Sequence, residues 1–346
     1  MQDNSICRNI LITGAAGFIG CNFVHYLLVD LQITEINLII LDNLSYSGNL
    51  ENLAFAEKYT NYKFFKGDIC DSELLDKIFT EYKIDGVINF AAESHVDRSI
   101  ISSLPFLNSN VVGTVALLDA SKKYGISKYL QISTDEVYGS LGDEGSFNEL
   151  SQIKPNSPYS ASKASADHFA ISYYKTHKMP IVITRCSNNY GPNQFPEKLI
   201  PLMILNALEN KPLPVYGDGL NVRDWIYVTD HCSAVWTVFN HGKNGEVYNI
   251  GGNSELTNLQ VVKTILQKLG KDESLITYVA DRPGHDRRYA MDINKINTEL
   301  GWSPAVSFEL GFKKTVNWYL DNLDWCSKIR SGEYLNYYKE QYGKEL

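Results

Sequence analysis

The chain of 346 residues is 44% hydrophobic and 21% charged, which suffices for one large or two ordinary globular domains and excludes a disordered or disulfide-stapled class. Forty acidic and 32 basic residues give a formal charge of −8 without a basic cluster, so a nucleic acid backbone would be repelled. With no run of about 18 apolar residues and no leader pattern, we expect no membrane contact and a cytoplasmic location. Six scattered cysteines without a CxxC pair predict neither a metal site nor a disulfide framework.

Short apolar runs alternate with longer segments of helical period through the first half of the chain. The runs span residues 8–13, 36–41, 62–66, 85–90, 128–133 and 180–185. This spacing is typical of βαβ units, and several runs are apolar at consecutive positions, as in strands covered by helices on both faces. The pattern therefore predicts an α/β fold with a doubly wound parallel sheet.

A glycine motif follows the first predicted strand and opens a helix, where bared amides and the helix N-terminus can bind a pyrophosphate. The second strand ends at Asp42, whose carboxylate can hydrogen-bond a ribose diol and repels a 2′-phosphate, and Asn43 offers no positive charge to receive one. We therefore predict NAD as the cofactor rather than NADP. The candidate cofactor-binding residues of these two segments are Gly14, Gly17, Phe18, Ile19, Gly20, Asp42 and Asn43.

Residues after the third and fourth predicted strands are further candidates for the cofactor site. Asp68 and Ile69 follow the third strand and can flank the adenine, while Ala91 and Ala92 at the end of the fourth let the backbone approach the cofactor.

Tyr159 and Lys163 lie four residues apart in a segment of helical period (159–177), which places the phenol and the ammonium on one helix face. A phenol with a pKa of about 10 is a poor base at neutral pH, but a lysine ammonium and a nicotinamide cation both favour the phenolate. The pair can then take a proton from an alcohol as a hydride leaves its carbon. We predict that both residues are catalytic and that both contact NAD.

Thr134, Asp135 and Glu136 follow the fifth strand, at the edge where open α/β sheets bind ligands. The threonine can hydrogen-bond a reacting hydroxyl. Simple alcohol oxidation does not need two adjacent carboxyls, so the doublet indicates further proton transfers, with one group as base and the other as acid. A solvated acidic loop is the open alternative for this pair.

Proline and glycine punctuate the chain after about residue 188, between shorter helical segments. We expect a first domain over 1–188 that carries the cofactor and the catalytic residues, and a smaller α/β substrate lobe over 189–346 with some segments returning to the first domain. The aromatic stretch 333–342 predicts a surface helix packed by its tyrosines.

The chain resembles the extended short-chain dehydrogenase/reductases and, within them, the dTDP-glucose 4,6-dehydratase family. The resemblance covers nearly the whole chain and rests on the segments TGAAGFIG (13–20), AAESHVDRS (91–99), STDEVYG (133–139), YSASK (159–163), RCSNNYGPNQFPEKLIP (185–201), VYGDGLNVRDWIYV (215–228) and DRPGHDRRYAMD (281–292). It implies a Rossmann domain and an NAD-dependent three-step reaction on a nucleotide-linked glucose. Ala15 departs from the Gly-Gly expected in the cofactor loop, which is tolerable if that position needs no positive φ.

The resemblance also implies the role of each catalytic residue. Tyr159, assisted by Thr134, removes the 4-hydroxyl proton while hydride passes to NAD⁺; Glu136 then removes the C5 proton. Asp135 protonates the leaving 6-hydroxyl, and hydride returns to C6. By the same resemblance dTDP-glucose is the substrate, a homodimer forms through segments near 106–124 and 159–177, and the substrate-binding residues are Ser94, Asn189, Lys198, Leu199, Pro214, Tyr216, Arg223, Asn258, Arg282, His285 and Tyr289. The alternatives are UDP-glucose as substrate, a 4-epimerase or decarboxylase of the same fold, and a non-enzymatic NAD-binding regulator.

Overall fold

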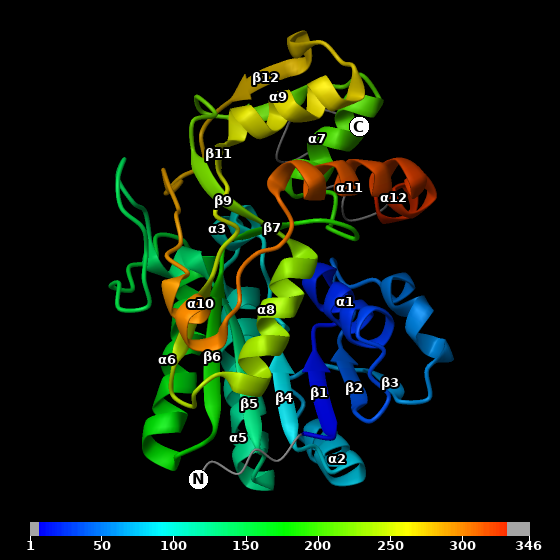
Figure 1. Ribbon diagram of the computed structural model, residues 1–346, viewed down its shortest axis with the longest axis vertical. Helices are drawn as coiled ribbons and strands as arrows, with labels where there is room; N and C mark the ends of the chain where they lie inside the picture. The colour runs from blue at the N-terminus through cyan, green and yellow to red at the C-terminus, as the bar shows by residue number, and fades with distance from the viewer. Residues whose placement is uncertain (1–6, 331–346) are drawn as a thin grey trace.

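The computed structural model describes residues 7–330 and contains a seven-stranded sheet whose neighbouring strands are all parallel (Figure 1). Its spatial order is β10-β6-β5-β4-β1-β2-β3. The strands are β1 (Asn9–Thr13), β2 (Asn37–Asp42), β3 (Tyr62–Lys66), β4 (Gly86–Asn89), β5 (Lys128–Thr134), β6 (Ile181–Cys186) and β10 (Val247–Ile250). The predicted apolar runs form the first six, and β10 is an additional strand from the second half of the chain.

Helices cover both faces of this sheet. One face packs against α1 (Phe18–His25), its continuation η1 (Tyr26–Asp30) and α8 (Val228–His241), and the other against α2 (Ser72–Tyr82), α5 (Thr114–Tyr124) and α6 (Pro158–His177). In β1, Ile10 and Ile12 enter the core on the α1 side, whereas Leu11 enters the core on the α2 side. The doubly wound α/β fold predicted from the sequence is therefore confirmed.

A smaller lobe lies beyond the carboxyl ends of the sheet strands (Figure 1). It contains a three-stranded sheet of β7 (Asn188–Tyr190), β9 (Val222–Tyr227) and β11 (Glu255–Thr257), and a strand pair of β8 (Leu213–Tyr216) and β12 (Ile276–Val279). Its helices are α7 (Leu199–Leu208), α9 (Asn258–Leu269), α11 (Phe308–Asp321) and α12 (Leu323–Ile329). The lobe has its own apolar core, in which Ile204, Val262 and Phe312 are almost completely buried.

The chain passes between the two parts several times. After β7 has entered the lobe, α8 and β10 pack on the large sheet, and α10 (Asn294–Leu300) packs on β10 before α11 enters the lobe again. The division into a cofactor domain over 1–188 and a substrate lobe over 189–346 stays a prediction. The segment 333–342, expected to form a surface helix, lies outside the described residues.

The remaining elements connect these layers. They are η2 (Leu50–Lys58), α3 (Val96–Ile101), α4 (Leu104–Phe106), η3 (Leu107–Gly113), η4 (Asp135–Tyr138) and η5 (Glu273–Leu275). Within residues 7–330, no helix combines the length and the apolar character needed to cross a bilayer.

Candidate active site

The turn between β1 and α1 has space only for glycine at two of its positions. Gly14 has φ +68°, and a Cβ there would lie 2.6 Å from the Cα of Ala91 at the end of β4. A Cβ on Gly20 would lie 2.6 Å from both the Cα of Ala15 and the carbonyl oxygen of Gly14. Ala15 has no positive φ, so its methyl group is compatible with the turn, as expected.

Asp42 at the end of β2 holds this turn in place. Its carboxylate accepts hydrogen bonds from the amides of Ala16 at 2.9 Å and Leu44 at 2.8 Å. Burial nevertheless raises the pKa of Asp42. Because each carboxylate oxygen has two lone pairs, Asp42 can hold the turn and still accept a bond from a ribose hydroxyl.

A cavity of about 270 Å³ opens over this turn at the carboxyl end of the sheet. All of the predicted cofactor-binding residues line it except Asp68. Asp68 instead accepts a hydrogen bond from the side-chain amide of Asn43 at 3.1 Å and another from the amide of Cys70 at 2.8 Å. Burial alone would raise the pKa of Asp68, but these hydrogen bonds lower it. The Asp68 carboxylate thus orients Asn43 without lining the cavity itself.

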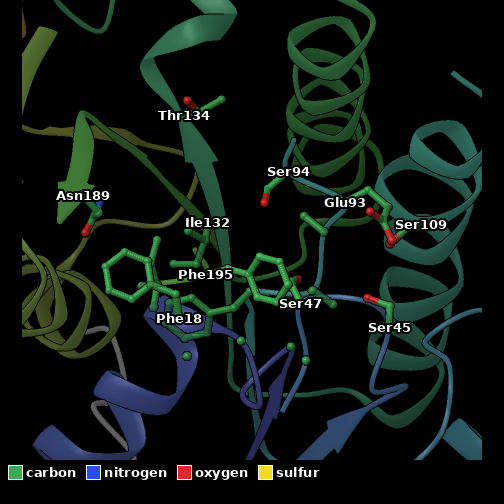
Figure 2. A pocket seen from close by; sticks show the side chains of 18 of the residues that line it. Phe18, Ser45, Ser47, Glu93, Ser94, Ser109, Ile132, Thr134, Asn189 and Phe195 are labelled. Atoms are coloured by element: carbon green, nitrogen blue, oxygen red, sulfur yellow. The ribbon is translucent and has the colours of Figure 1, made fainter. Parts of the chain in front are cut away.

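Several lining residues of this first cavity were not predicted. Figure 2 shows Ser45, Ser94, Ser109 and Glu93 on one side of the cavity and Asn189 on the opposite side, with Thr134 at the end of its strand. The additional lining residues include Ser45, Tyr46, Ser47, Glu93, Ser109, Phe195 and Glu197. The position of Ser45, Tyr46 and Ser47 shortly after Asp42, at the carboxyl end of the second strand, was the available signal for the first three.

The acidic doublet lies inside the site rather than in a solvated loop. Thr134 caps the short helix η4, accepts a hydrogen bond from the amide of Glu136 at 3.3 Å and donates to Oδ1 of Asp135 at 3.1 Å. Among the described residues, the buried Oδ2 of Asp135 has no partner. Burial, reinforced by the negative charge of Glu136, raises the pKa of Asp135 well above its usual range, which favours the protonated form of this carboxyl.

Glu136 is in a different electrostatic environment. Burial raises its pKa too, but the positive charges of Arg223, Arg282 and Lys198 oppose that effect. The two adjacent carboxyls therefore differ, because nearby cations counteract burial at Glu136, whereas the neighbouring negative charge adds to burial at Asp135. This is the environment that acid and base roles require.

Tyr159 and Lys163 lie in the first turns of α6, which begins with a capping box formed by Ser157 and Ser160. The Lys163 ammonium donates to the carbonyl oxygen of Ile132 at 2.7 Å, and burial lowers the pKa of Lys163. Burial, with Glu136 and other groups adding to it, raises the pKa of Tyr159 well above its usual range, although the Thr134 hydroxyl opposes the effect. The protein alone therefore keeps the phenol protonated, and a cation in the first cavity is needed to favour the phenolate.

A second cavity of about 170 Å³ adjoins the first. The two share the walls formed by Ser94, Glu136, Asn188, Glu197 and Lys198, so they meet at Glu136, while Asp135 lines only the first cavity. All of the predicted substrate-binding residues line the second cavity except one.

Asn189 is the exception, and its contact with the substrate stays a prediction. It lines only the first cavity, where its side-chain oxygen lies 2.9 Å from His231 Nδ1 and its side-chain nitrogen donates to the carbonyl oxygen of Ser187 at 3.0 Å. Its neighbour Asn188 lines both cavities.

The second cavity is rich in cations. Arg223 donates to the carbonyl oxygens of Val222 at 2.8 Å and Asp286 at 3.0 Å, and its guanidinium lies 4.4 Å from the centre of the Tyr289 ring. Lys198 donates to the carbonyl oxygen of Ser94 at 2.8 Å. Both cations are thus held by neutral groups, which leaves their charge available for an anionic ligand such as a diphosphate.

Comparisons with known proteins agree with this geometry. A family model described as GDP-mannose 4,6 dehydratase matches residues 11–315. A probable dTDP-glucose 4,6-dehydratase of Sinorhizobium fredii is 50% identical over 341 residues, which cover 94% of this chain and 96% of the relative.

Two solved structures are similar over almost the same length. The crystal structure of dTDP-glucose 4,6-dehydratase from Bacillus anthracis in complex with NAD is 53% identical, covers 93% of this chain and 99% of its own, and has a TM-score of 0.87. The enzyme of that activity from Streptomyces venezuelae, also with NAD bound, is 46% identical with the same coverage and a TM-score of 0.90.

Proposed function

The chain belongs to the GDP-mannose 4,6 dehydratase family and, within it, to the dTDP-glucose 4,6-dehydratases, and from this premise we propose how its residues carry out the reaction. The enzyme is an NAD-dependent hydro-lyase that converts dTDP-glucose into dTDP-4-keto-6-deoxyglucose. The observation that carries the proposal is the position of Asp135 and Glu136: both line the first cavity together with Tyr159, and Glu136 also lines the second.

The first cavity fits the dinucleotide. The turn that only glycine can form at Gly14 and Gly20 leaves amides bare for a pyrophosphate, and Asp42 lies where a ribose would be held. NAD bound there accepts a hydride from the sugar and later returns it, so no net oxidation results. Lys163 and Tyr159 lie at the inner end of the same cavity.

The side chains then divide the proton transfers among themselves. Tyr159, with Thr134 beside it, takes the proton of the 4-hydroxyl as C4 becomes a ketone. The ketone acidifies the hydrogen on C5, and Glu136 removes that proton and gives it back to C5 when the hydride returns to C6. Asp135 gives its proton to the 6-hydroxyl, which departs as water. The charges around the doublet support this order, because nearby cations counteract the effect of burial on the pKa of Glu136, whereas burial and the charge of Glu136 both favour the protonated form of Asp135.

Incubation with dTDP-glucose and with UDP-glucose, followed by mass spectrometry, tests the proposal. Loss of one water from dTDP-glucose is the expected result, and turnover of UDP-glucose in parallel measures the choice of nucleotide. Unchanged mass with inversion at C4 would identify a 4-epimerase and overturn the assigned roles of Asp135 and Glu136.

We also propose that the chain forms a homodimer and acts in the cytoplasm. An apolar face on α3, α4, η3 and α6 supports the dimer, because Ile101 is 68% exposed, Leu104 64%, Leu107 48% and Phe169 41%. Large apolar side chains gathered on neighbouring helices are typical of a surface that another protein covers. A second copy of this chain is the occupant that we propose.

A further inference from the structure

The first turn of α3 makes ionic contacts with the substrate lobe. Asp97 is 6% exposed and lines the second cavity. Its Oδ1 lies 2.5 Å from Nε of Arg282, and its Oδ2 accepts from Nη2 of the same guanidinium at 3.0 Å. The hydroxyl of Tyr216 also donates to Oδ2, at 3.3 Å. One carboxylate on the large domain thus joins two elements of the lobe.

Arg282 belongs to a segment without regular secondary structure, between β12 and α10. A long side chain on such a segment has many accessible rotamers, and an ion pair with a buried carboxylate restricts it to few of them. The hydrogen bond to Asp97 uses Nη2, while Nε lies within ion-pair distance of the same carboxylate. The guanidinium also lies 5.3 Å from the ring centre of Tyr216, which limits its rotation further.

We propose that Asp97 is a positioning residue that orients Arg282 toward the diphosphate of the nucleotide sugar. This inference rests on the proposed function, because it takes a nucleoside diphosphate as the ligand of the second cavity. Asp97 does not touch the reacting atoms in this scheme and acts only through Arg282. The negative charge of Asp97 close to the diphosphate weakens binding. In this proposal the orientation of the Arg282 guanidinium strengthens binding by more than that repulsion weakens it.

The sign of the effect of Asp97→Asn separates positioning from simple electrostatics. Removal of a negative charge beside a bound diphosphate strengthens binding if charge alone matters. Loss of the ion pair weakens binding if orientation matters. We expect KM for dTDP-glucose to rise about tenfold, within the range of coupled neighbours, while kcat falls much less. The dissociation constant of dTDP, measured by calorimetry, should rise by the same factor.

Asp218→Asn is the matched control. Asp218 is ion-paired with Arg287, five residues after Arg282, at 2.9 Å, and both of these side chains are about half exposed. Asp218→Asn removes the same charge as Asp97→Asn, but from an aspartate–arginine pair that does not line the second cavity. KM and dTDP binding should therefore stay at the wild-type values.

A double-variant cycle tests the coupling directly. With Arg282→Ala already present, Asp97→Asn should cause a much smaller loss of dTDP affinity than in the wild-type background, because the guanidinium that it positions has been removed. Tighter or unchanged dTDP binding by Asp97→Asn, or equal losses in both backgrounds, would overturn the proposal.

The experiment also separates a structural role from positioning. The melting temperature and the NAD content of Asp97→Asn should stay close to the wild type, whereas damage to the fold lowers both together with kcat. If that variant does not fold, Asp97→Glu keeps the charge but displaces it by one methylene, and it should raise KM in the same way. Wild-type turnover of dTDP-glucose is measured first, so failure of the proposed function is seen independently of Asp97.

Discussion

The hydroxyl of Thr134 donates to Oδ1 of Asp135 across 3.1 Å, which connects the residue beside the first proton transfer with the residue assigned to the last. The same hydroxyl acts on Tyr159, whose pKa it helps to lower against the effect of burial. Oxidation at C4 and loss of the 6-hydroxyl are therefore served by one continuous set of side chains. The predictions below separate the two stages.

Asp135→Asn and Glu136→Gln should stop the reaction after the first oxidation. Both substitutions are nearly isosteric and leave Tyr159 and Lys163 in place. On rapid mixing with dTDP-glucose, absorbance of the reduced cofactor should appear and persist, and no 4-keto-6-deoxy product should form. Glu136→Gln should also lose exchange of the C5 hydrogen with solvent deuterium, which Asp135→Asn can retain. A double variant that loses water at the wild-type rate contradicts both roles.

Tyr159→Phe should abolish the first step, because the ring is kept while the group that takes the proton is removed. Loss of a general base costs on the order of 10² to 10⁴ in rate. The absorbance of the reduced cofactor should therefore fail to appear on mixing with substrate. Tyr173→Phe on the same helix is the control, since its hydroxyl donates to the surface residue Asp119 at 2.9 Å, and Tyr173 does not line the first cavity. Near-complete activity in Tyr159→Phe would exclude it as the base.

Arg223→Gln should move the acid limb of the kcat profile to higher pH. Glu136 acts as a base only when ionised, so the rate is lost as the pH falls through its pKa. Burial raises that pKa, and the charge of Arg223 is the first of the groups that lower it. Removing the charge therefore raises the pKa of Glu136 and brings the loss of rate to a higher pH. The profile is measured at saturating dTDP-glucose, and Arg287→Gln, on the surface, should leave it unchanged.

Gly20→Ala should reduce the NAD that copurifies with the protein. The added Cβ would lie 2.6 Å from backbone atoms of Ala15 and Gly14, so the turn must open. The released nucleotide is quantified by chromatography after denaturation. Gly142→Ala is the matched control, because a Cβ at that position has no neighbour within 4 Å among the described residues. A full complement of NAD in Gly20→Ala contradicts the assignment of this turn to the cofactor.

Leu104→Glu should convert the proposed dimer into monomers, because a carboxylate buried in an apolar interface has no partner. Light scattering coupled to size exclusion measures the mass. Leu150→Glu places the same charge on a residue that is 95% exposed and lies away from the apolar face, so it should leave the mass unchanged. A wild-type protein that is already monomeric at micromolar concentration would refute the dimer.

The sequence predicted those parts of the molecule whose signals are local. Six strands, the glycine turn and the helix of Tyr159 each have a pattern within about a dozen residues, and each is found where it was predicted. The four residues of β10 have no such pattern. They form a strand only because they pair in parallel with β6, which is distant from them in the sequence.

The charged residues inside the site were harder to predict. Asp97 and Glu197 belong to segments that were recognised, but a charged side chain is on the surface in most proteins, and only the partners reveal its burial. Asp97 is buried because Arg282, 185 residues later, meets it. The hydrogen bond from Lys163 to the carbonyl oxygen of Ile132 joins a helix to a strand and likewise has no signature in the sequence.

The repeated passage of the chain between the sheet and the lobe determines how the lobe can be handled experimentally. α8, β10 and α10 come from the second half of the chain, but β10 is a strand of the large sheet and the two helices pack beside it. The lobe is therefore not a continuous stretch of sequence. A single proteolytic cut between β6 and β7 would leave the lobe attached through these later elements. Transplanting its substrate specificity onto a related enzyme would therefore require the exchange of several separate segments, each ending at a point where the chain enters or leaves the sheet.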